Sequence, residues 1–78
     1  MKKELAEQEK AKHTNLVNKL LIHKNHNAKM LVMEIGINAK FPGGDSYFVY
    51  CKLRGKSGDV TETLEYVLAN YCVSVVPM

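Results

Sequence analysis

Two stretches near the middle of the chain alternate between apolar and other side chains, and a turn-forming segment joins them. The stretches cover residues 30–39 and 46–54, and the segment between them contains Pro42, Gly43 and Gly44. Proline fixes one φ angle and glycine accepts a positive one, so this segment suits a turn. Alternation with a period of two is typical of strands, and so short a connection favours antiparallel pairing. The sequence therefore predicts a β-hairpin.

Helix-forming residues precede this hairpin. Good helix formers dominate residues 3–24, and the apolar side chains of the second half recur at helical spacing. They are Leu16, Val17, Leu20 and Leu21. We expect that half to dock on the rest of the protein. Few apolar residues stand before Thr14, so residues 1–13 are expected to form a basic, partly mobile helical extension and residues 14–78 a single α+β domain.

An amphipathic segment follows the hairpin. Asp59 stands three residues before Glu62, which is the spacing of a capping box at the start of a helix. The apolar stripe of the predicted helix consists of Val60, Leu64, Val67, Leu68 and Tyr71. The β-branched run over residues 71–76 then predicts a last strand.

The predicted elements have the order α-β-β-α-β. A chain of 78 residues has room for one small domain. A sheet needs one buried side and each helix presents one apolar stripe, so we expect both helices to cover one face of a three-stranded antiparallel sheet. The predicted fold is a small single α+β domain whose second sheet face carries no helix.

That uncovered sheet face is the predicted site of binding. Its side chains are expected to be Met30, Val32, Phe48, Tyr50, Lys52 and Arg54. Apolar groups rimmed by charge on a protein surface usually mark a contact. A core this small is often completed by an oligomer or a partner. We therefore expect a non-enzymatic interaction protein, a regulator or inhibitor, that binds a larger protein or complex and acts as a homodimer.

Binding to RNA or DNA is the alternative. Alternate residues of the second strand place two aromatic side chains beside two basic ones, as in sheet-based RNA modules. The four lysines Lys2, Lys3, Lys10 and Lys12 could add a second basic contact. Three glutamates stand among them, however, and the net charge of the chain is only +3. The balance of charge favours a protein partner over a nucleic acid.

Three sets of residues are candidates for sites of chemistry. Residues 55–57 (GKS) resemble the end of a phosphate-binding loop, but Tyr50 stands where that loop needs a glycine. His23 and His26 could meet one metal at i and i+3 of a helix, but a zinc site needs three or four ligands and no nearby carboxylate completes it. With His13 they suit solvated or capping histidines at a helix end. A cysteine with a histidine could form a nucleophile and base, but no orienting residue is evident for Cys51. We expect no catalysis, no metal and no cofactor.

The cysteine count and the hydropathy bear on the compartment. Two cysteines, Cys51 and Cys72, are too few for a disulfide scaffold, so both are expected to be reduced thiols packed as small apolar groups. No apolar run reaches the length of about 18 residues that a membrane span needs, and the first residues are charged. A cytoplasmic protein without membrane contact is expected.

Overall fold

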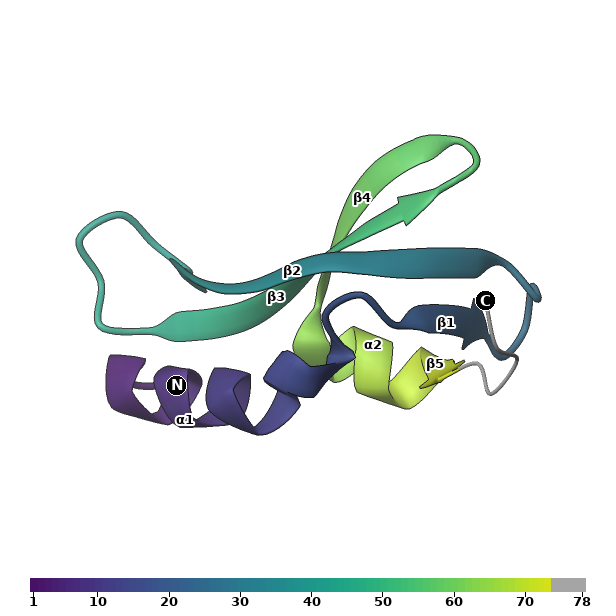
Figure 1. The fold of residues 1–78 in the computed structure, drawn as a ribbon. Helices are drawn as coiled ribbons and strands as arrows, with labels where there is room; N and C mark the ends of the chain where they lie inside the picture. The colour runs from purple at the N-terminus through teal and green to yellow at the C-terminus, as the bar shows by residue number, and fades with distance from the viewer. Residues whose placement is uncertain (74–78) are drawn as a thin grey trace.

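The fold is seen in a computed structural model of the chain that describes residues 1–73 (Figure 1). In chain order its elements are α1 (Lys3–His13), the short 3₁₀ helix η1 (Thr14–Leu16), β1 (Leu20–His23), β2 (Lys29–Ala39), β3 (Tyr47–Gly55), β4 (Gly58–Thr63), α2 (Leu64–Asn70) and β5 (Tyr71–Val73). The strands form one antiparallel sheet with the order β4-β3-β2-β1-β5. The predicted α+β class and the hairpin of β2 and β3 are confirmed. Residues 74–76 of the predicted last strand lie outside the described residues.

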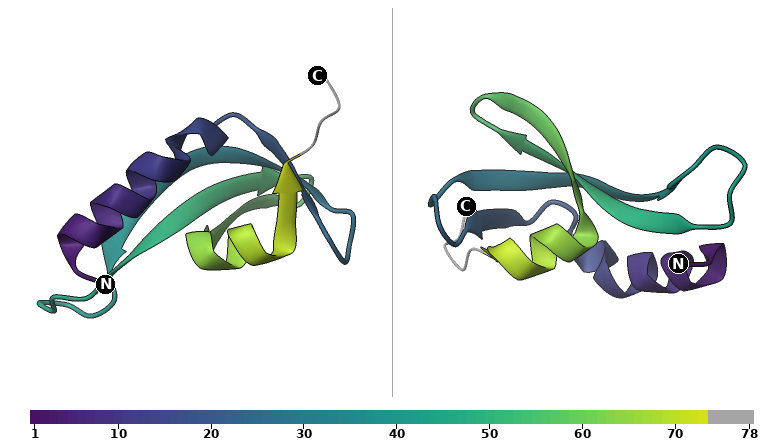
Figure 2. Two further views of the ribbon diagram at one scale, coloured as in Figure 1. Left: turned by 90° about the horizontal axis from the view of Figure 1, so that it is seen from below. Right: turned by 180° about the vertical axis from the view of Figure 1, so that it is seen from behind.

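Both helices lie on one face of the sheet, as predicted (Figures 1 and 2). Helix α1 reaches the core through Ala6, and α2 reaches it through Leu64 and Val67. These three buried side chains pack with a cluster from the strands, which consists of Leu21, Val32, Ile35, Val49, Cys51 and Leu53. The core therefore sits between the sheet and the helix pair. The mobility expected for residues 1–13 stays a prediction.

The helix predicted over residues 3–24 ends at His13, so the prediction was wrong for its second half. Asn18 adopts a positive φ of 70° and turns the chain. Its backbone N–H donates to the Val32 carbonyl at 2.8 Å, and Lys19 accepts from the Val32 N–H at 3.0 Å. Pairing with β2 provides hydrogen-bond partners for the backbone N–H and C=O groups of the segment after Asn18. This tertiary pairing outweighs the local helix propensity of the segment.

The helix predicted from Asp59 begins at Leu64, and residues Gly58–Thr63 form β4 instead. The cap of α2 is Thr63, whose side-chain oxygen accepts from the Tyr66 N–H at 3.1 Å. Asp59 binds Arg54 across the tight turn between β3 and β4, so its carboxylate does not cap a helix. With β1 and β4 added, the sheet has five strands and not the expected three.

A bulge in β2 changes which side chains face the helices. The register with β3 shifts between Val32 and Glu34, which leaves Met33 without a partner across the strand pair. Such an extra residue reverses the alternation of faces along one strand. Val32 and Ile35 are consequently both buried under the helices. The predicted place of Val32 on the uncovered face was wrong, and so was that of Met30, which is half-buried against the core.

Candidate functional site

The sheet face opposite the helices is called the open face here. Strand β3 contributes Phe48, Tyr50, Lys52 and Arg54 to it, as the alternation predicted. Cross-strand partners share a face in an antiparallel sheet, and they extend the open face over β2 and β4. These partners are Leu31, Glu34, Gly36 and Asn38 on one side and Asp59, Thr61 and Thr63 on the other. Four of the six predicted site residues therefore lie on one surface.

The ring of Tyr50 occupies the space left by the glycine opposite it, Gly36. A methyl group at Gly36 would overlap the ring and the hydroxyl of Tyr50, so only a glycine lets this ring lie on the β2 backbone. The ring borders a hollow of about 280 Å³. The hollow is lined by Glu34, Asn38, Phe48, Tyr50, Lys52 and Thr61. A ring packed on a backbone has less conformational freedom to lose on binding than a ring in open water, which lowers the entropic cost of binding.

The cations of the open face are matched by carboxylates. Arg54 donates from Nε to Asp59 Oδ1 at 2.8 Å and from Nη2 to Oδ2 at 3.3 Å. The Arg54 hydrogen bond holds the pKa of the Asp59 carboxyl below its ordinary value. Lys52 stands directly opposite Glu34 across the strand pair. An exposed pair such as Arg54 and Asp59 adds little stability, but it removes free positive charge from this surface.

Three apolar side chains form the other end of the open face. Leu20 pairs with Leu31, and both lie on the side of the sheet away from the buried Leu21. Ile22 follows at the same face, where its partner in β5 is the exposed Cys72. Leu20 and Ile22 were missed because their segment was assigned to a helix. The available signal was Asn18, a residue type that tolerates the positive φ at which the chain turns.

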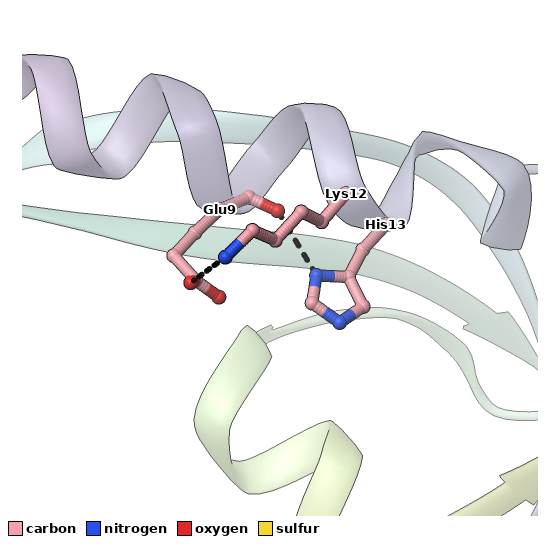
Figure 3. Close-up of polar contacts among 3 residues, drawn as sticks. All are labelled: Glu9, Lys12 and His13. Carbon is pink, nitrogen blue, oxygen red and sulfur yellow. Dashed lines mark hydrogen bonds and ion pairs between the residues drawn. The ribbon is translucent and has the colours of Figure 1, made fainter.

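The predicted basic contact lies on the opposite side of the molecule. Lys2, Lys3, Lys10 and Lys12 lie on or beside α1, which covers the other sheet face. Lys12 forms an ion pair with Glu9 at 3.4 Å, and the carbonyl of Glu9 is 2.9 Å from His13 Nδ1 (Figure 3). A single flat partner surface cannot contact this helix and the open face together.

A groove of about 630 Å³ lies between α1, α2 and the first part of β3. Tyr47, Val49 and Leu68 contribute apolar side chains to its lining. Phe48 borders this groove as well as the hollow on the open face. A change at Phe48 would therefore alter both surfaces, and Tyr50 is the cleaner probe of the open face.

The three histidines do not come together as a metal site. His23 lies in β1 and is buried at 4% exposure, so the expectation of a solvated or capping histidine at a helix end was wrong for this residue. Its ring lies between His26 and Tyr71, whereas His13 binds its own helix. Within residues 1–73 no group of three or more His, Cys, Asp or Glu side chains is placed to hold a metal ion.

Both cysteines are free thiols, and only one of them is packed inside. Cys51 is fully buried, and burial raises its pKa to about 11. Cys72 is exposed, so the expectation that it packs as an apolar group was wrong. The reactive species of a thiol is the thiolate. The environment of Cys51 is that of an inert core residue and not of a nucleophile.

Alkylation should separate the two thiols. With iodoacetamide at about pH 8, where a raised pKa keeps Cys51 protonated, we expect one modification on the folded protein, at Cys72, and a second only after denaturation. Mass spectrometry of the intact chain and of its peptides measures both. The Cys72→Ser variant is the control and should remain unmodified while folded. Equal modification rates for the two cysteines in the native protein would contradict the burial of Cys51.

No helix in the described part of the chain, residues 1–73, has the length and apolar character needed to cross a membrane. Comparisons with protein-family models, with curated proteins and with solved structures give no match to this chain. The function is therefore inferred from the geometry of the open face and the chemistry of its side chains.

Proposed function

We propose that the protein is a non-enzymatic binding protein, a regulator or inhibitor, that acts by docking its open face on a larger protein. One observation carries the proposal. Both helices cover the same side of the sheet, so no helix among residues 1–73 shields the aromatic and apolar side chains of the other side. When a partner removes such groups from water, the free energy of the complex falls, so this surface favours binding.

The residue types of the open face favour a protein partner. Tyrosine and arginine dominate the energetics of protein interfaces, and Tyr50 and Arg54 stand two strand positions from Lys52 on either side. A nucleic acid would instead be bound through cations that release counterions from phosphates. Here Arg54 is occupied by Asp59 and Lys52 faces Glu34. Nucleic-acid binding is therefore the second outcome of the test and not the proposal.

The docking surface is tested by affinity capture of a partner from an extract of the native host, with the wild type and two matched variants as bait. Tyr50→Ala removes the ring fixed over Gly36, and Gln8→Ala changes an exposed position on the opposite side of the sheet. We expect a protein partner to be retained from nuclease-treated extract by the wild type and by Gln8→Ala. Its affinity for Tyr50→Ala should fall at least about tenfold, which is the loss expected for an interface hot spot.

Two results would oppose the proposal. Equal retention by Tyr50→Ala and the wild type would place the contact elsewhere. Retention of RNA or DNA alone, with an affinity that falls steeply as salt rises, would establish the nucleic-acid alternative.

The proposal includes a homodimer that forms through the same open face. The open face carries charges of both signs. In a two-fold contact the basic groups of one copy can therefore meet the acidic groups of the other. The apolar end with Leu20, Ile22 and Leu31 supplies the area for such a contact. Sedimentation velocity should show a dimer for the wild type and a monomer for Leu31→Asp. A wild type that stays monomeric at every concentration would remove self-association from the proposal.

The free thiols of Cys51 and Cys72 support a reducing compartment such as the cytoplasm.

A further inference from the structure

The buried His23 holds the turn between β1 and β2 through its ring. The backbone N–H of Asn25 donates to His23 Nδ1 at 3.1 Å. Because Nδ1 accepts this bond, the ring must be neutral, with its proton on Nε2. Nε2 then donates to the hydroxyl of Tyr66 on α2 at 3.1 Å. Both ring nitrogens are therefore used in a state that carries no charge.

The same turn also holds the end of α2. The Lys24 N–H donates to the Asn70 carbonyl at 2.9 Å, and Lys24 Nζ donates to the Ala69 carbonyl at 3.2 Å. These carbonyls belong to the last turn of α2, where a helix leaves its acceptors without partners. The strand that follows, β5, has three residues and pairs only with β1 among the described strands. The position of α2 and β5 at this end thus depends on the turn that His23 supports.

Among residues 1–73, aromatic and histidine side chains surround the ring, and no carboxylate is bonded to it. The groups that face it are Tyr66 from α2, Tyr71 from β5 and His26 from the turn, with ring centroids of His23 and His26 at 4.5 Å. The carboxylate that reaches this cluster is Glu62 of β4, which acts on Tyr71. No hydrogen bond or ion pair within residues 1–73 joins a carboxylate to His23.

We propose that His23 is a pH-sensitive latch, which holds the β1–β2 turn against the end of α2 when its ring is neutral and releases that turn when the ring is protonated. A proton on Nδ1 turns the acceptor of the Asn25 N–H into a donor, so this bond is lost. Protonation of His26 as well would place two cations in contact. The cationic Lys24 already occupies the α2 carbonyls that could otherwise stabilise an imidazolium.

The sign of the pH effect follows from proton linkage. The latched state excludes the proton from Nδ1 and the released state accepts it, so acid favours release. Histidine changes charge between about pH 5 and 8, which sets the window. We therefore expect the turn to lose protection as the pH is lowered from about 7.5 to about 5.5.

Hydrogen exchange measured by NMR tests the latch on the full chain. The reporters are the amides of Lys24, Asn25 and Asn27, with those of β5, and the internal control is the set of amides in β2 and β3. Protection factors are compared, because they remove the intrinsic pH dependence of exchange. We expect the reporters to lose protection on acidification while the control amides keep theirs.

The His23→Asn variant separates the latch from a general effect of acid. The asparagine side-chain oxygen can accept from the Asn25 N–H and does not titrate, so the variant should hold the same protection at both pH values. Nitrogen chemical shifts of the His23 ring in the wild type supply a second measurement, which needs no variant. They should report the Nε2–H tautomer at neutral pH. Unchanged reporters in the wild type, an equal loss in His23→Asn, or a ring that carries its proton on Nδ1 at neutral pH would overturn the proposal.

Discussion

Replacing Val32 by aspartate should unfold the domain, whereas the same replacement at the neighbouring Leu31 should leave it folded. Val32 is fully buried between the sheet and the helices. An unpaired carboxylate at this position costs several kcal/mol, and a domain of this length has a total stability of only about 4 to 12 kcal/mol. Leu31 lies on the open face, where a carboxylate keeps contact with water. Far-UV circular dichroism and the dispersion of an amide NMR spectrum distinguish the two outcomes.

A milder change at Val32 gives a measurable loss in place of unfolding. Val32→Ala should lower the free energy of unfolding by about 2 kcal/mol through lost burial and the cavity left behind. Urea denaturation measures this loss. If Val32→Asp instead remained folded and Leu31→Asp did not, the two faces of β2 before the bulge would be exchanged. That result would also remove Leu31 from the open face.

The long alternating strands could be predicted from the sequence because each carries its own signal. In β3 every second residue from Val49 to Leu53 is buried, and no bulge interrupts the pattern. This alternation was sufficient to place Tyr50 and Lys52 on the open face. In β2 the four residues from Met30 to Met33 are all apolar, so the pattern there fits either phase and does not reveal the bulge. Val32 and Met30 were misplaced for that reason.

The short strands could not be predicted because distant partners determine them. The spacing of Asp59 and Glu62 is that of a capping box, and a helix there is locally reasonable. The glycines at Gly55 and Gly58 instead close a tight turn, with Gly58 at a φ of 120°, and the following residues pair with β3. Asp59 then meets Arg54 across the turn. Strand formation of this kind depends on cross-strand neighbours more than on intrinsic preference.

The adjacent leucines of β1 provide the sharpest test of strand against helix in the first third of the chain. Leu21→Ala should lower the free energy of unfolding by about 2 to 5 kcal/mol, because Leu21 is among the largest fully buried side chains. Leu20→Ala should cost less than about 1 kcal/mol, because its side chain points to the open face. Urea denaturation of both variants against the wild type measures the difference.

The contrast between the two leucines depends on strand geometry. Successive side chains of a strand point to opposite faces, so one leucine must be inside and the other outside. On a helix with an apolar stripe of ordinary width, both would lie on the docked face and both variants would be strongly destabilised. Similar losses for Leu20→Ala and Leu21→Ala would therefore contradict β1. Because Leu20 lies at the apolar end of the open face, that result would also take away the area on which the homodimer depends.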